Sequence, residues 1–187
     1  MRILGGKAKG RRILTLKGKR ARPTLQIVRK SIFDILGDRV KDASVLDLFA
    51  GSGSLGLEAL SRGSREVTFV DTNRDVLQKV KENVDLLRLD GRVSLRKRDA
   101  FRMLRALDRD GKNYDVVFVD PPYHSGLPVR VLEALETSNV LAPDGVLVLE
   151  HPIQTDLPEV MSRLSLWKAR EFGGTRISFY QKQEESL

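Results

Sequence analysis

The sequence predicts an α/β fold in which helices cover both faces of a mostly parallel, seven-stranded sheet. From residue 44 onward, short apolar runs alternate with stretches of helical spacing, as in a doubly wound sheet. The runs are apolar almost throughout, which is typical of parallel strands buried on both faces. The last two runs are joined by Gly173-Gly174, which predicts a C-terminal antiparallel hairpin.

The expected elements follow one another in regular order. The expected parallel strands are Val45–Phe49, Val67–Asp71, Val93–Lys97, Val116–Asp120 and Val146–Glu150. The expected helices lie near residues 54–62, 73–88, 100–108 and 128–137. The expected hairpin strands are Leu164–Glu171 and Thr175–Gln181.

Length and composition suit one domain with a small appendage. The chain has 187 residues, of which 41% are hydrophobic, and no run approaches the ~20 apolar residues of a membrane span. The N-terminus lacks the apolar core of a signal peptide. There is no cysteine and only two histidines, so neither disulfides nor a metal centre is expected. We expect a cytoplasmic monomer that binds no membrane.

Basic charge is concentrated at the N-terminus. Residues 1–33 hold eleven of the 33 Lys and Arg residues and no Asp or Glu, which leaves 22 basic against 25 acidic residues elsewhere. This asymmetry favours a polyanion-binding segment over a tail that only confers solubility. The candidate contacts with nucleic acid are Lys7, Lys9, Arg11, Arg12, Arg20, Arg22 and Arg29.

Two elements are expected within this segment. Residues 3–16 resemble a short β-hairpin that bends at glycines, and a helix is expected to enter at Pro23-Thr24. Its apolar stripe comprises Ile27, Val28, Ile32, Phe33, Ile35 and Leu36, with Arg29 and Lys30 off the stripe. We therefore expect residues 1–36 to form a basic, nucleic-acid-binding extension and residues 37–187 to form the main domain.

A glycine-rich loop follows the first strand and opens a helix. Gly51, Gly53 and Gly56 match the pattern G-x-G-x-x-G, and Asp71 lies where an acid would bind ribose hydroxyls. Glycines alone do not distinguish NAD from S-adenosylmethionine. Asp47 favours the latter, because a carboxylate before the loop suits a cationic amino-acid end and would repel a pyrophosphate.

Asp99-Ala100 follows the third strand, where a polar side chain can reach an adenine amino group. Helix N-capping is the alternative role for Asp47 and Asp99, and for Asp99 it is about as well supported as ligand binding. The candidate cofactor-binding residues are Asp47, Phe49, Ala50, Gly51, Gly53, Gly56, Asp71, Thr72, Asp99, Ala100 and Asp120.

Asp120-Pro121-Pro122-Tyr123 ends the fourth strand and supplies the candidate catalytic residues. Ligands in open α/β sheets bind beyond the carboxyl ends of the strands, so this motif and the glycine loop should share one crevice. The Asp120 carboxylate and the Pro121 carbonyl can each accept an N–H from an exocyclic amine and aim its lone pair at a methyl donor. Tyr123 can stack on an unstacked base. A merely rigid turn is the weaker alternative.

The chain resembles the RsmD-like 16S rRNA (guanine-N2)-methyltransferases over nearly its whole length. The resemblance rests on Arg2–Gly6, Lys9–Arg12, Arg22-Pro23-Thr24, Val28-Arg29, Phe33, Asp47–Gly63, Asp120–Tyr123, Phe172-Gly173 and Thr175. It implies a Rossmann-like class I methyltransferase fold, S-adenosylmethionine as methyl donor, and a guanine N2 target in 16S rRNA within the small subunit or its precursor. It also implies that the N-terminal segment grips RNA. Gln26, Ile27 and Lys30 depart from the family pattern, which has an acid, a base and an acid there.

Other functions remain open on the residues alone. The Asp-Pro-Pro-Tyr motif is shared with DNA adenine-N6 methyltransferases. Methylation of a protein glutamine is disfavoured because the related motif usually starts with Asn. A nucleic-acid-binding protein with a degenerate cofactor site is opposed by the intact glycines, Asp71 and Asp120, and no residue set for hydride transfer supports an oxidoreductase.

Overall fold

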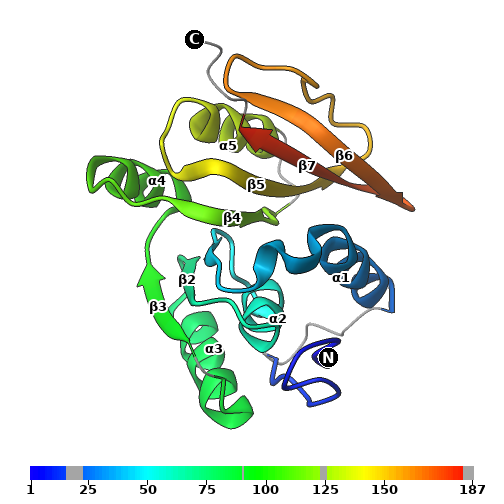
Figure 1. Ribbon diagram of the computed structural model, residues 1–187, viewed down its shortest axis with the longest axis vertical. Helices are drawn as coiled ribbons and strands as arrows, with labels where there is room; N and C mark the ends of the chain where they lie inside the picture. Colours follow the sequence, from blue (N-terminus) through cyan, green and yellow to red (C-terminus); the bar gives the residue numbers. More distant parts are fainter. Residues whose placement is uncertain (16–22, 90, 123–125, 183–187) are drawn as a thin grey trace.

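The computed structural model describes residues 1–15, 23–89, 91–122 and 126–182 and shows one seven-stranded sheet in the order β3-β2-β1-β4-β5-β7-β6 (Figure 1). The predicted doubly wound α/β fold is confirmed. The strands are β1 Ser44–Asp47, β2 Glu66–Asp71, β3 Arg92–Lys97, β4 Tyr114–Val119, β5 Leu141–Pro152, β6 Leu164–Phe172 and β7 Thr175–Lys182.

The first five strands run parallel, and the last two turn back. β1 pairs in parallel with β2 and β4, whereas β7 is antiparallel to both β5 and β6. The hairpin predicted from Gly173-Gly174 is therefore confirmed, and Gly173 has φ +60° at its turn. β5 spans twelve residues, more than the five expected, because its extended backbone continues at both ends beside β7 and β4.

Helices cover the two faces of the sheet in two groups. The helices are α1 Pro23–Leu36, α2 Ser54–Ser61, α3 Arg74–Leu87, α4 Ala100–Arg109 and α5 Leu127–Glu136, with a 3-10 turn η1 at Gly37–Val40. One core cluster joins α1, α2 and α3 to the face that carries Val116 and Phe118 of β4. The other joins α4 and α5 to the face that carries Val117 and Val119. Because successive side chains of β4 point to opposite faces of the sheet, this strand contributes to both cores.

The N-terminal segment packs on the α2 side of the domain. The expected hairpin is reduced to one bridge, between Arg2 and Arg12, supported by bonds such as Ile3 N–H to Arg11 O at 3.0 Å. Ile3 and Ile13 are nevertheless buried in the same core as α1. The glycine-interrupted backbone makes a compact loop in place of a regular ladder.

Helix α1 begins at Pro23 as predicted, but two predictions about its faces are wrong. Ile27, placed on the apolar stripe, is 59% exposed, whereas Arg29, placed off the stripe, is 2% exposed. The buried face of α1 includes Arg29 because its guanidinium forms an ion pair with the buried Glu58 carboxylate and donates to the Arg2 carbonyl. The departures Gln26, Ile27 and Lys30 all lie on the exposed face.

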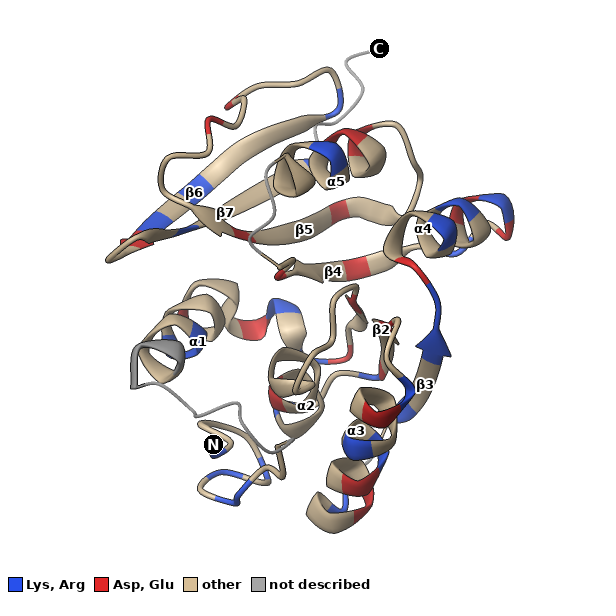
Figure 2. Cartoon of the chain, turned by 180° about the vertical axis from the view of Figure 1, so that it is seen from behind, with Lys and Arg blue, Asp and Glu red and all other residues tan. Residues whose placement is uncertain are grey.

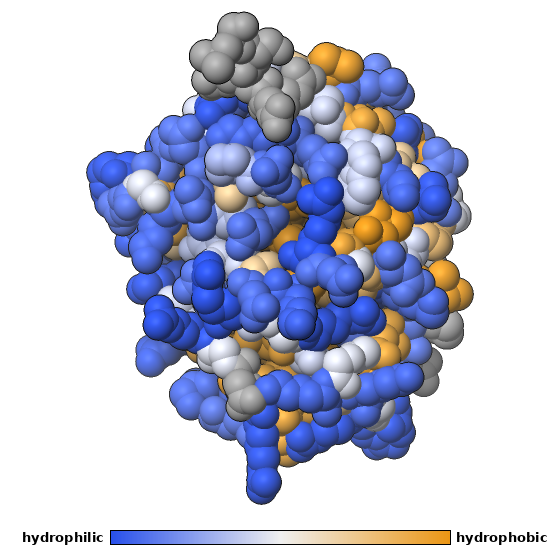
Figure 3. Space-filling view, in the orientation of Figure 1, coloured by the Kyte–Doolittle hydropathy of each residue, from blue (hydrophilic) through white to orange (hydrophobic). Residues whose placement is uncertain are grey.

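The outer surface seen in Figure 3 is mostly hydrophilic, with apolar groups showing between the polar ones. Among the described residues, no helix is both long and apolar enough to cross a membrane.

Candidate active site

A cavity of about 620 Å³ lies beyond the carboxyl ends of β1, β2 and β4. It brings together segments that are far apart in the sequence, as the crevice of a parallel sheet should. The predicted site residues that line it are Asp47, Phe49, Ala50, Gly51, Asp71, Thr72, Asp99, Ala100, Asp120, Pro121 and Pro122. The glycine loop and the Asp-Pro-Pro segment therefore face one space.

The loop after β1 is tied to the end of β2. Gly51 has φ +51°, a conformation that suits glycine, and its N–H donates to Asp71 Oδ2 at 3.0 Å. Asp71 Oδ1 accepts from Asn73 N–H at 2.8 Å. Asp71 thus holds the loop in shape and remains at the cavity wall.

Asp47 is a buried carboxyl group at the floor of the cavity. Its Oδ2 accepts from Gly56 N–H at 3.2 Å, and the residue is 2% exposed. Burial raises the pKa of Asp47 to about 7, although the Gly56 bond opposes the shift and Asp71 adds to it. A buried carboxyl group with this pKa would be stabilised as a carboxylate by a cation, which fits the amino-acid end of S-adenosylmethionine.

Gly53 and Gly56, two predicted cofactor contacts, do not line the cavity. Gly53 has φ +72° at the start of α2, and a Cβ there would lie 2.7 Å from Val80 Cγ2. A Cβ on Gly56 would overlap the Phe69 ring. These glycines shape the loop and let α2 approach β2 and α3, and their contact with the cofactor stays a prediction.

Two further predicted parts of the site are Asp99, after β3, and the segment that follows β4. Asp99 caps α4, accepting from Arg102 N–H at 3.1 Å, and also lines the cavity, so both roles proposed from its position are compatible with its placement. At the end of β4, Pro121 is buried and Asp120 is exposed to the cavity. Tyr123 lies outside the described residues.

Eight cavity residues were not among the predicted site residues, and four of them, Leu48, Ser52, Ser54 and Leu55, belong to the loop after β1 and the start of α2. Arg98 follows β3, and Glu150 lies near the carboxyl end of β5, so their position at the same sheet edge was a usable signal. Met1 and Thr15 come from the N-terminal segment. Nothing in the local sequence marks them, because only the folding of that segment across α2 brings them there.

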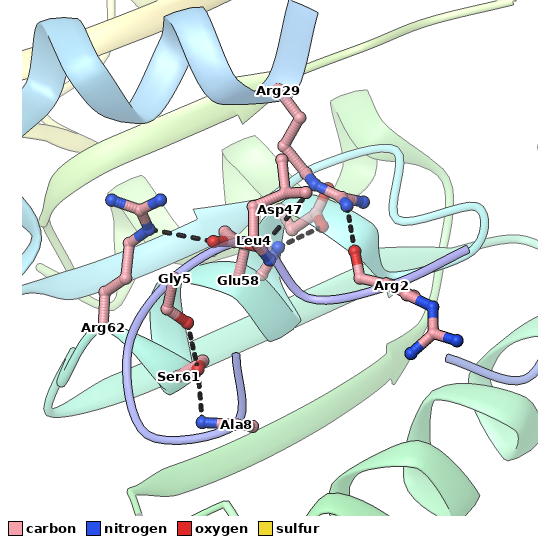
Figure 4. Close-up of polar contacts among 10 residues, drawn as sticks. Arg2, Leu4, Gly5, Ala8, Arg29, Asp47, Glu58, Ser61 and Arg62 are labelled. Atoms are coloured by element: carbon pink, nitrogen blue, oxygen red, sulfur yellow. Dashed lines mark hydrogen bonds and ion pairs between the residues drawn. The ribbon is translucent and has the colours of Figure 1, made fainter. Parts of the chain in front are cut away.

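A buried ionic cluster holds the N-terminal segment in place (Figure 4). In this Glu58 cluster, Leu4 N–H donates to Glu58 Oε2 at 2.8 Å and Arg62 Nε donates to Oε1 at 2.9 Å. Arg29 Nε lies 3.6 Å from Oε2, and its Nη2 donates to Arg2 O. Burial lowers the pKa of Arg29, and the Glu58 carboxylate counteracts this.

Ser61 extends the attachment by one turn of α2. Its hydroxyl donates to Gly5 O at 2.6 Å and accepts from Ala8 N–H at 3.0 Å. Backbone groups of the segment thus find partners on α2. Met1 and Thr15 reach the cavity wall as a consequence.

The predicted RNA-contacting residues are placed unequally. Arg29 is buried, so the expectation that it contacts RNA is not supported by its position. Arg11 donates to the carbonyls of Leu86 and Leu87 at the end of α3, which engages its guanidinium within the chain. Lys7, Lys9 and Arg12 are exposed, and Arg20 and Arg22 lie outside the described residues.

The fold and the cavity define this chain as a class I methyltransferase, the class whose methyl donor is S-adenosylmethionine. Residues 1–181 match the model of the family described as Conserved hypothetical protein 95, and the chain belongs to that family. It is 36% identical over 183 residues to YlbH of Bacillus subtilis, named as a candidate rRNA methyltransferase, covering 98% of this chain and 100% of that protein. It is 33% identical over 185 residues to ribosomal RNA small subunit methyltransferase D of Escherichia coli, covering 99% and 91%.

A solved structure is also similar to this chain. The Escherichia coli protein yhhF, described as a candidate methyltransferase, superposes with a TM-score of 0.86 at 34% identity and 98% coverage of both chains.

Proposed function

We propose that this protein transfers a methyl group from S-adenosylmethionine to the exocyclic N2 amine of a guanine in 16S rRNA. The observation that carries the proposal is the single cavity that Asp47, Asp71, Asp120 and Pro121 all line. The names of the relatives, which give ribosomal RNA of the small subunit as substrate, support the choice of RNA.

Asp47 would hold the cationic amino-acid end of the cofactor, and Asp71 would hold its ribose hydroxyls. Asp99, which also lines the cavity, would meet the adenine amino group. When bound, S-adenosylmethionine supplies an electrophilic methyl group on a sulfonium centre. These assignments follow the chemistry of each side chain at the cavity wall.

Asp120 and Pro121 would position the substrate amine. The Asp120 carboxylate and the Pro121 carbonyl each accept one N–H, which directs the nitrogen lone pair into the cavity and stabilises the positive charge that develops on nitrogen. Tyr123 is proposed to stack on the base, as at other sites that take a base out of its helix.

The wider setting is part of the same proposal. Residues 1–36 act as an RNA-gripping extension of a methyltransferase domain at residues 37–187. The protein works as a cytoplasmic monomer on the small subunit or its precursor. No metal is needed, because a sulfonium methyl group is electrophilic without a Lewis acid.

A labelled methyl-transfer assay tests the proposal. Small subunits from cells that lack the gene, free 16S transcript and duplex DNA are incubated with labelled S-adenosylmethionine, with and without a chelator. We expect label in 16S rRNA as N2-methylguanine in both conditions. Label confined to DNA as N6-methyladenine would overturn the RNA assignment, and the absence of cofactor binding in calorimetry would overturn catalysis.

A further inference from the structure

A second cavity, of about 690 Å³, runs along the edge strand β3 beside α4. We call it the β3–α4 groove and define it by Arg92, Arg96, Arg98, Lys112 and Tyr114, all of which line it. Figure 2 shows Lys and Arg on β3 and along α4. The surface over these two elements is hydrophilic in Figure 3.

The groove lies in a strongly basic stretch. Residues 92–112 hold eight Lys or Arg and three Asp. Asp99 caps α4 and Asp108 accepts from Asn139 N–H at 2.7 Å, whereas Asp110 pairs with Arg109 and lines the groove, as does Glu66. Six Lys or Arg residues and two carboxylates line the groove, so it keeps an excess of positive charge.

The arginines of β3 point into the groove. Val93 and Leu95 pack on the core that contains α3, so the alternating residues Arg92 and Arg96 face the opposite side, toward α4. Burial raises the pKa of Tyr114; the Thr68 hydrogen bond opposes this shift, the Glu66 charge adds to it, and the Arg96 charge opposes it. Arg96 is thus within electrostatic range of the groove floor.

Three of the groove cations have no side-chain partner among the described residues. In the part of the chain that the structure describes, no hydrogen bond or ion pair joins the side chains of Arg92, Arg98 or Lys112 to another residue. By contrast, Arg2, Arg11 and Arg29 of the N-terminal segment bond to backbone carbonyls. Arg92, Arg98 and Lys112 are therefore available to an external anion.

The groove adjoins the cofactor cavity at one shared residue. Arg98, directly after β3, lines both spaces. From Arg98 back to Arg92, the strand extends for about 20 Å, the length of several phosphates along one strand. A polyanion seated in the groove would lead into the site where a base is to be methylated.

We propose that the β3–α4 groove binds the sugar-phosphate backbone of the RNA that flanks the target nucleotide. This inference rests on the proposed function and assigns it a contact surface separate from the N-terminal segment. Arg92, Arg96 and Lys112 contact phosphates, and Arg98 guides the chain to the cavity. Sequence-independent contacts of this kind position RNA and leave base choice to the cavity.

The test removes charge from the groove and leaves the cofactor cavity intact. The groove variant is Arg92→Gln, Arg96→Gln and Lys112→Gln; Arg98 is kept because it lines the cofactor cavity. The control variant, Lys41→Gln, Lys81→Gln and Arg170→Gln, removes three exposed charges elsewhere. Dissociation constants for small subunits from cells that lack the gene, and for free 16S transcript, are measured against salt concentration.

We expect the groove variant to bind RNA at least about tenfold more weakly at ~0.1 M salt, with a log–log salt slope smaller by about 2. Its affinity for S-adenosylmethionine should equal that of the wild type. Arg92→Lys with Arg96→Lys should retain most of the slope, because the charge is kept. The control variant should match the wild type.

A groove variant with the slope of the control would overturn the inference. If that variant instead self-associates in light scattering, the charges serve to protect the open edge of β3. Methyl transfer by the wild type distinguishes a failure of the proposed function from a failure of the groove inference. A wild type that methylates no rRNA refutes the proposed function, whereas an active wild type with an unaffected groove variant refutes the groove alone.

Discussion

Arg29 Nε lies 3.6 Å from Glu58 Oε2, and both side chains are shut away from solvent, with exposures of 3% and 0%. This pair joins α1 to α2 and lies beneath the segment that carries Met1 to the cavity wall. It links the stability of the N-terminal segment to the geometry of the active site.

Removing one member of this pair should destabilise the protein strongly. We expect Glu58→Ala to lower the free energy of unfolding by about 3–5 kcal/mol, because Arg29 would be left as an uncompensated buried charge. Denaturant unfolding measures the change. The matched control is Asp34→Asn, which breaks the exposed Lys30–Asp34 pair and should cost under about 0.5 kcal/mol. Similar losses for both variants would contradict the buried pair's importance.

On the proposed function, Asp120→Ala should reduce the rate of methyl transfer by about a hundredfold or more, since one of the two acceptors proposed to orient the amine would be lost. Cofactor affinity, measured by calorimetry, should change little. Single-turnover kinetics on rRNA report the rate. Wild-type turnover in this variant would exclude Asp120 from the chemistry.

Asp47 should make stability depend on pH. Its folded-state pKa of about 7 lies above the ordinary 3.8, so the folded protein binds more protons than the unfolded chain between these values. The stabilisation from the protonated group is fully present below about pH 4 and is lost as the pH rises to about 7. The free energy of unfolding is measured at several pH values for the wild type and for Asp47→Asn. Its slope against pH should differ between the two proteins across this window. Parallel curves would refute the raised pKa.

The same carboxyl group should release a proton when the cofactor binds. A cation beside Asp47 favours the carboxylate, so binding below about pH 7 should expel the proton that burial retains. Calorimetry in buffers of different ionisation enthalpy measures this release. Asp47→Asn should abolish it, and an equal release in that variant would place the cationic end of the cofactor elsewhere.

Gly56→Ala should destabilise the fold by about 1–3 kcal/mol, because the new methyl group overlaps the Phe69 ring. Gly174→Ala is the control, since a Cβ there meets nothing within 4 Å, and its effect should stay within about 0.5 kcal/mol. Thermal unfolding compares the two. An unchanged melting temperature for Gly56→Ala would mean that α2 can shift away from β2.

Arg11 and Arg12 should behave differently although they are neighbours. Arg12→Gln should weaken RNA binding and lower the salt slope by about 1, because its side chain is exposed. Arg11→Gln should instead cost about 0.3–1 kcal/mol of stability, since its guanidinium binds carbonyls at the end of α3. Salt-dependent RNA binding and unfolding are measured on both variants. Lower stability in Arg12→Gln together with weaker RNA binding in Arg11→Gln would contradict this assignment.

The sequence determined the sheet, the order of its elements and the core of the active site. Strand–helix alternation requires parallel strands, and parallel strands place their carboxyl ends at one edge. Asp47, Asp71 and Asp120 each end a strand or follow one, so their meeting at one cavity could be predicted from position alone.

Only the tertiary structure decided which charges are buried and which face outward. Local periodicity predicts an exposed Arg29. The side chain is buried because it forms an ion pair with Glu58, which lies on a different helix. Residues after 33 carry a net negative charge in sum, yet the fold gathers Arg92, Arg96 and Lys112 along one groove. Net charge and periodicity are properties of the chain, whereas burial and the local field depend on side chains brought together from distant segments.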